Sequence, residues 1–174
     1  MGLLNYFFKK KRTSAQVGYD LFDLCISATK FHLPTYEKIR TDMEIELNEY
    51  ESRMELTEIL VTNMWSTTKA LSGADLDEAV RCMHDRYFIE CHHEENREDA
   101  QKALLARYEQ YESLFDHEKG QHIMLASQIL ANMYNDGEVS KEYLDVFAGL
   151  EVVTCFSDVM VKALEHVGKF KICD

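Results

Sequence analysis

The helical character of this chain is clearest in residues 34–54, which read PTYEKIRTDMEIELNEYESRM. Apolar side chains recur there every three or four residues, at Tyr36, Ile39, Met43, Leu47, Tyr50 and Met54. The same spacing continues towards Leu60, Met64 and Trp65. Because residues three and four apart share one face of an α-helix, this pattern predicts a long amphipathic helix. Pro34 suits its first turn, where the missing N–H is not needed.

The residues before this stretch predict another helix. Thr13-Ser14 is typical of a helix N-cap, and apolar residues at helical spacing extend from Ala15 to about Lys30. Residues 32–35, which read HLPT, are expected to separate this helix from the next one, because a proline disfavours a continuous helix.

The residues after this stretch predict four more helices. Asp75 in the Ser72-Gly73-Ala74-Asp75 boundary is the expected N-cap of a helix over about 76–92. A polar run at 94–99 precedes a helix over about 103–115, and residues 116–120 are expected to form a turn. A helix over about 123–133 should end at Asn135-Asp136-Gly137, and Ser140 can cap the last one, which extends to about Leu164.

The composition agrees with a single helical domain. The chain has 174 residues, of which 46% are hydrophobic, with one proline and seven glycines, so few residues are suited to the turns of a multi-stranded sheet. We therefore expect an all-α helical bundle of about six helices over residues 13–174. Residues 148–164 form the most apolar window, but Glu151, Asp158 and Lys162 favour a core helix there over a membrane span.

The first twelve residues, MGLLNYFFKKKR, differ from the rest of the chain. In a helix, the apolar side chains at 3, 4, 7 and 8 would share one face, and four cations follow them. This pattern predicts a short amphipathic helix that docks to a membrane surface or to a partner protein. The expected docking residues are Leu3, Leu4, Phe7, Phe8, Lys9, Lys10, Lys11 and Arg12. The alternative is that the apolar face packs on the protein's own bundle.

The remaining residues are strongly acidic. The chain has a net charge of −12, and without the four N-terminal cations 15 basic residues stand against 31 acidic ones, which gives −16. Such a surface repels nucleic acid, so direct nucleic-acid binding is not expected, and it favours a basic protein partner. An alternative function follows, that of an acidic inhibitor or nucleic-acid mimic that occupies a basic groove of its partner.

The five cysteines indicate where the protein resides. Their number is odd and they contain no Cys-x-x-Cys pair, which is typical of free thiols in a reducing compartment. No secretory signal is expected, because the apolar N-terminal stretch is short and precedes the cations. We expect a cytoplasmic protein, or one held at the inner face of a membrane.

Catalytic and cofactor motifs are weak in this sequence. Glu90 and His93 have the Glu-x-x-His spacing that places two metal ligands on one helix face in di-iron bundles, but a second copy is missing. The alternative is a polar helix end, where a histidine complements the helix dipole. No nucleotide-binding glycine motif occurs, so no cofactor and no catalytic residue are expected. A metal-dependent helical-bundle enzyme is the second alternative function.

The N-terminal stretch Leu3-Leu4-Asn5-Tyr6-Phe7, the cations at 9–12 and the turn Thr13-Ser14-Ala15 resemble MinE, the bacterial cell-division topological specificity factor. A fainter likeness covers Leu33-Pro34-Thr35-Tyr36 and residues 38–43. In that family the N-terminal segment is a membrane-targeting amphipathic helix, so the resemblance implies the same role for Leu3, Leu4, Phe7 and Phe8. It covers about the first 50 residues. The leading hypothesis is a non-catalytic helical adaptor or regulatory protein that docks through this segment.

Overall fold

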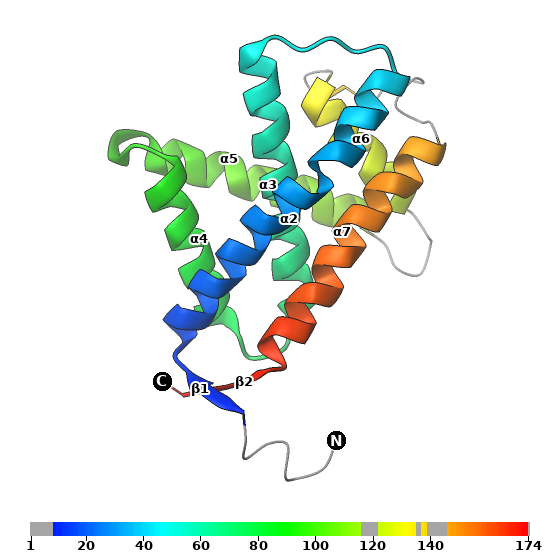
Figure 1. Ribbon diagram of the computed structural model, residues 1–174. Helices are drawn as coiled ribbons and strands as arrows, with labels where there is room; N and C mark the ends of the chain where they lie inside the picture. Colours follow the sequence, from blue (N-terminus) through cyan, green and yellow to red (C-terminus); the bar gives the residue numbers. More distant parts are fainter. Residues whose placement is uncertain (1–8, 116–121, 135–136, 139–145, 174) are drawn as a thin grey trace.

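The structure, a computed structural model, describes residues 9–115, 122–134, 137–138 and 146–173. Within these ranges the chain forms six α-helices, and the expected all-α bundle is confirmed (Figure 1). The helices are α2 (Ser14–Asp42), α3 (Glu49–Leu71), α4 (Asp77–Cys91), α5 (Arg97–Leu114), α6 (His122–Tyr134) and α7 (Val146–Val167). A 3-10 helix, η1 (Glu94–Asn96), precedes α5, and two short strands, β1 (Lys10–Arg12) and β2 (Phe170–Ile172), flank the helices in the sequence.

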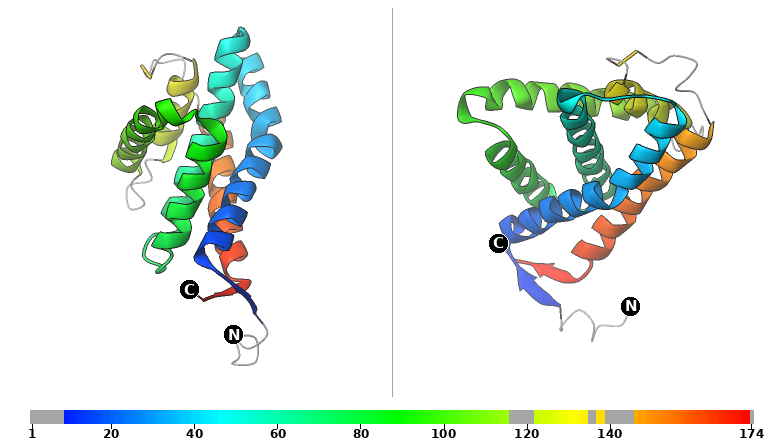
Figure 2. Two further views of the ribbon diagram at one scale, coloured as in Figure 1. Left: turned by 90° about the vertical axis from the view of Figure 1, so that its left-hand side faces the viewer. Right: turned by 45° about the horizontal axis from the view of Figure 1, so that its top comes forward.

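Helix α3 lies at the centre of the bundle. Every residue from 58 to 67 is buried, because α2, α6 and α7 pack against it on different sides (Figures 1 and 2). The indole of Trp65 contacts three aromatic rings edge-on, with centroids 5.2–6.1 Å away. These rings belong to Tyr111, Phe115 and Phe156. Such edge-to-face contacts add to the free energy of apolar burial, so Trp65 joins α3 to α5 and α7.

The long helix α2 crosses Pro34, which corrects the expected break at residues 32–35. Proline in a helix interior leaves one carbonyl without its N–H partner and costs about 3 kcal/mol. Residues on both sides of it are buried, His32 at 4% exposure and Tyr36 at 1%, and this packing holds the helix together across the proline. The free energy of burial therefore outweighs the local preference.

The predicted long helix from Pro34 towards Trp65 is also wrong as a single element, because α2 ends at Asp42 and α3 begins at Glu49. Asn48 caps α3: its side chain accepts a hydrogen bond from the Glu51 N–H, and the Glu51 carboxylate accepts one from the Asn48 N–H. This capping box starts a new helix inside a stretch with unbroken apolar spacing.

Other predicted helix ends are partly confirmed. Thr13 caps α2 through a capping box with Gln16, and Gly137, with a φ of 85°, follows the end of α6. Asp75 is not the N-cap of α4, because it lies in the preceding turn with a φ of 55°, and Leu76 occupies the cap position. The predicted turn at 116–120, the cap at Ser140 and the residues Asn135 and Asp136 lie outside the described residues.

Helix α7 contains the window 148–164 that was expected to be a core helix. Val152, Phe156, Val159 and Ala163 are at most 1% exposed and face the bundle. In the part of the chain that the structure describes, no helix has both the length and the apolar character that crossing a membrane requires.

Candidate functional site

The two ends of the described chain meet in a small parallel sheet. Strand β1 pairs with β2 so that Lys10, Lys11 and Arg12 stand beside Phe170, Lys171 and Ile172 in register (Figure 1). The Arg12 guanidinium lies over the Phe170 ring, 5.5 Å from its centroid, and the Cys173 N–H donates a hydrogen bond of 3.0 Å to the Arg12 carbonyl. Since Phe170 and Ile172 pack against the core, the sheet attaches the basic N-terminal segment to one end of the bundle.

The structure gives the positions of the four cations among the predicted docking residues. Lys10 and Lys11 are exposed on β1, while Lys9 and Arg12 are partly buried. The predicted N-terminal helix does not extend over the cations at 10–12, because these residues form a strand. The apolar residues Leu3, Leu4, Phe7 and Phe8 lie outside the described residues, and their role stays a prediction.

Two further cations belong to the same end of the molecule and were missed by the sequence analysis. Lys169 precedes β2 and Lys171 lies within it, directly beside Lys11. The alternation of lysine with apolar residues in Lys169-Phe170-Lys171-Ile172 is a signal of a strand with one buried face. Nothing local, however, indicates its partner, because the two strands are separated by almost the whole sequence.

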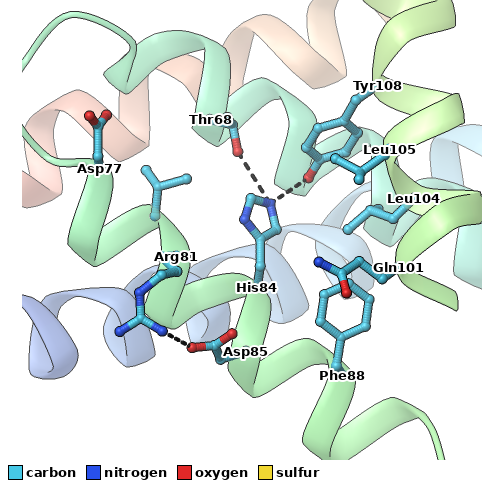
Figure 3. A pocket seen from close by; sticks show the side chains of 11 residues that line it. Thr68, Asp77, Arg81, His84, Asp85, Phe88, Gln101, Leu104, Leu105 and Tyr108 are labelled. Atoms are coloured by element: carbon cyan, nitrogen blue, oxygen red, sulfur yellow. Dashed lines mark hydrogen bonds and ion pairs between the residues drawn. The ribbon is translucent and has the colours of Figure 1, made fainter. Parts of the chain in front are cut away.

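A groove lies between α4 and α5, with a volume of about 410 Å³ (Figure 3). Val80, Phe88, Leu104 and Leu105 make most of its lining apolar. At its polar side, His84 Nε2 lies 3.0 Å from the Tyr108 hydroxyl and 3.5 Å from Thr68 Oγ1 (Figure 3).

Burial determines the protonation of His84. It lowers the pKa of the imidazole to about 4, so the ring is neutral near pH 7. On the rim, Arg81 is paired with Glu78 and Asp85 at 2.5–2.6 Å. The groove can accept an apolar group; of the ionisable side chains that line it, His84 bonds to Tyr108 and Arg81 pairs with Asp85, and Asp77 is the remaining one.

A second groove, of about 510 Å³, lies between α2 and α7 beside Pro34. His32 Nε2 and Asp158 Oδ2 are 3.1 Å apart there, and Lys162 lies 2.6 Å from the same carboxylate. Cys155 also lines the groove, but burial raises the pKa of its thiol to about 11. Because the thiolate is the nucleophilic form, this shift lowers the nucleophilicity of Cys155 at neutral pH, although His32 and Asp158 line the same groove.

Two buried glutamates on α3 were not anticipated from the sequence. Glu58, at 6% exposure, accepts a hydrogen bond from the Tyr111 hydroxyl and lies 3.3 Å from Arg107 Nε. Glu55, at 3% exposure, accepts one of 2.5 Å from the Tyr134 hydroxyl. Burial raises the pKa of Glu58 to about 7, although Arg107 opposes the shift. These hydrogen bonds connect α3 to α5 and α6, so the glutamates belong to the bundle's interior.

The metal hypothesis at Glu90 and His93 is not supported by the geometry. Helix α4 ends at Cys91, so His93 lies beyond it and the two side chains do not share a helix face. Glu90 instead forms an ion pair of 2.6 Å with Arg86. Among the described residues, no three histidine, cysteine or acidic side chains are grouped closely enough to hold a metal ion.

The thiol prediction is confirmed, since Cys25, Cys82, Cys91, Cys155 and Cys173 are all free. Comparisons with models of protein families, with curated proteins and with solved structures found no match. The candidate site is the end of the bundle that carries β1 and β2, because the cations Lys10 and Lys11 are exposed there.

Proposed function

We propose that this protein is a non-catalytic helical adaptor or regulator that docks to an anionic membrane surface through residues 1–12. The observation that supports this most is the position of the cations: Lys10 and Lys11 are exposed on β1, at the end of the bundle where both ends of the described chain lie. The apolar residues Leu3, Leu4, Phe7 and Phe8 precede them directly in the sequence.

The energies involved are sufficient for reversible binding. Complete burial of a leucine or phenylalanine side chain contributes about 1.5–3 kcal/mol, and each lysine near an anionic surface adds about 1 kcal/mol. An anionic membrane repels the acidic remainder of the protein, so the protein should approach the membrane with this basic end. The resemblance of residues 3–15 to the membrane-targeting segment of the MinE family also supports the proposal.

Vesicle co-sedimentation tests this function. Wild-type protein should sediment with phosphatidylcholine vesicles that contain phosphatidylglycerol and should remain in the supernatant with phosphatidylcholine alone. Leu3→Asp/Phe7→Asp should lose binding, whereas Leu56→Asp, which changes an exposed leucine on α3, should bind like the wild type. If the wild-type protein does not sediment with either vesicle, the membrane proposal is wrong, and a protein partner becomes the occupant to test for residues 1–12.

A further inference from the structure

We infer that α7 carries a binding surface for the N-terminal segment of the same chain, residues 1–8. The surface, called the α7 stripe below, consists of the apolar residues on the outward side of the helix: Leu150, Val153, Met160, Val161 and Leu164. The apolar side chains of residues 1–8 pack on it when no membrane is present. This contact is independent of the proposed function, whereas its effect on membrane binding rests on that function, because both use the same side chains.

The α7 stripe is apolar and yet exposed. Leu150, Val161 and Leu164 are 48–54% exposed, and Val153 and Met160 are partly exposed. These positions recur every three or four residues, so they share one side of the helix. Charged residues make up 29% of the chain, but none lies on this side of α7. A helix face that only meets water normally carries charged side chains, so the composition of the stripe favours a bound partner.

The register of the sheet places the start of residues 1–8 beside this helix. Strands β1 and β2 are parallel with Lys10 beside Phe170, so the chain before β1 leaves the sheet on the side where the chain from α7 enters it. Only two residues separate the end of α7 at Val167 from β2. Figure 1 shows β1 beginning near the end of α7. An antiparallel pair would have directed residues 1–8 away from the helix.

Eight residues are long enough to cover the nearer part of the α7 stripe. At a rise of about 1.5 Å per residue, Leu164 lies about 5 Å and Val161 about 9 Å along the axis from the end of the helix. Residues 1–8 span about 12 Å as a helix and about 28 Å when extended. Their four apolar side chains therefore reach Leu164 and Val161 in either conformation.

Charge and covalent linkage favour this segment over a second copy of the chain. Two copies with a net charge of −12 each repel one another. Residues 1–8 contain no acidic side chain and are followed by four cations. Because the segment belongs to the same chain, its effective concentration at the stripe is on the order of millimolar, so a weak contact is sufficient.

Contact with α7 limits membrane binding. A leucine or phenylalanine that packs on the α7 stripe cannot enter a membrane at the same time. The apparent affinity for vesicles is therefore lowered by the fraction of molecules whose segment is free. An anionic membrane also attracts the exposed cations Lys10 and Lys11, so it shifts the segment from the helix to the membrane. The stripe thus acts as an autoinhibitory surface for the proposed docking segment.

Proteolysis of the full chain without lipid tests the contact. Tyr6, Phe7 and Phe8 are sites for chymotrypsin, and mass spectrometry of the intact protein follows the loss of the residues before each cut. Val161→Gln/Leu164→Gln removes apolar surface from the α7 stripe without a change of charge. This α7 variant should be cleaved at these sites about tenfold faster than the wild type, because its segment is more often free.

Two further variants show whether the effect is specific. Met54→Gln/Leu56→Gln changes two exposed apolar residues of α3 and should be cleaved like the wild type. Leu3→Gln/Leu4→Gln weakens the other side of the contact, keeps the cleavage sites and should also be cleaved faster. Combined with the α7 variant, it should add little further increase, because the contact is already lost. Circular dichroism melting establishes that each variant is folded.

Vesicle co-sedimentation tests the autoinhibition. The α7 variant should bind phosphatidylglycerol-containing vesicles about tenfold more tightly than the wild type, because a larger fraction of its molecules has a free segment. If it binds more weakly than the wild type, the α7 stripe itself contacts the membrane and the inference is wrong.

The outcomes separate this inference from the proposed function. If wild-type protein binds vesicles but the α7 variant is cleaved and binds as the wild type does, the membrane function stands and the contact with α7 is wrong. If the α7 variant is cleaved faster but neither protein binds vesicles, the contact stands and the membrane function is wrong. If light scattering finds a dimer for the wild type and a monomer for the α7 variant, the stripe is an interface between copies and the inference is overturned.

Discussion

Gly18 of α2 lies against the backbone of Ala79 in α4: a Cβ at position 18 would be 2.4 Å from the Ala79 carbonyl oxygen and 2.6 Å from the Cys82 Cβ. Helices α2 and α4 therefore approach more closely than any side chain at this position permits. The absence of a side chain at Gly18 is what allows α4 to pack along α2.

Substitution of Gly18 by alanine should destabilise the protein. Alanine favours the helix by about 1 kcal/mol over glycine, but the clash with a backbone oxygen cannot be relieved by a side-chain rotation, so we expect a net loss of about 1–2 kcal/mol. Gly149→Ala on α7 is the matched control, because its Cβ would meet Ile123 at an ordinary 3.4 Å. Urea unfolding of both variants measures the difference, and an equal stability of the two would contradict the close-contact explanation.

Substitution of Pro34 by alanine should stabilise the protein. Alanine supplies the N–H that can donate to the Lys30 carbonyl within α2, and the gain should be about 2 kcal/mol after the smaller entropy of the proline-containing unfolded chain is subtracted. Pro34→Gly restores the same N–H but should gain about 1 kcal/mol less. A lower melting temperature for Pro34→Ala would show that the proline ring contributes packing that outweighs the missing hydrogen bond.

The stability of the wild-type protein should carry a pH dependence from Glu58. Its pKa is about 7 in the folded protein and 4.5 ordinarily, so between these values the folded state holds a proton that the unfolded chain has released. This contribution is complete below about pH 4.5 and is lost as the pH rises to about 7. Glu58→Gln lacks this titration, so its unfolding free energy relative to wild type should rise by about 3 kcal/mol over that interval.

The control for this experiment is Glu95→Gln, which changes an exposed glutamate on η1. Unfolding free energies of the three proteins, measured by urea titration at several pH values, should diverge only for Glu58→Gln. Parallel curves for wild type and Glu58→Gln would mean that Glu58 ionises normally inside the bundle.

Substitution of Lys11 by glutamate should weaken membrane binding. The change should weaken binding to phosphatidylglycerol-containing vesicles about 30-fold, because it reverses the charge of an exposed residue on β1. Lys30→Glu, with the same charge change at an exposed position on α2, should weaken binding far less. Vesicle co-sedimentation measures both variants, and equal binding by Lys11→Glu and Lys30→Glu would show that the position of the cation on β1 does not matter.

Several features of the fold could be predicted because they depend on neighbours within one or two helical turns. The spacing of the apolar residues predicted the helices, and the polar pair Thr13-Ser14 predicted the N-cap of α2, which is Thr13. The failure at Pro34 has a physical cause: the local cost of a proline is a few kcal/mol, and the burial of residues such as Tyr36 against other helices exceeds it. Asp75 was misassigned because aspartate suits both an N-cap and a turn residue with positive φ.

The candidate site was only half predictable for a related reason. The cations at 9–12 are adjacent in the sequence and could be recognised together, whereas Lys171 stands beside Lys11 only through strand pairing, and Lys169 directly precedes the paired strand. The buried glutamates were missed because a glutamate among apolar residues has the same local pattern whether it faces water or the hydroxyl of Tyr111.

Short-range periodicity, composition and charge are sufficient to establish an acidic, all-helical chain with a basic N-terminal segment. These properties depend on side-chain spacing along single helices and on simple sums of charge. The pairing of β1 with β2, the close crossing at Gly18 and the burial of Glu58 arise only when distant segments pack together. They depend on desolvation and contact between elements, and no local pattern in the chain encodes which elements will meet.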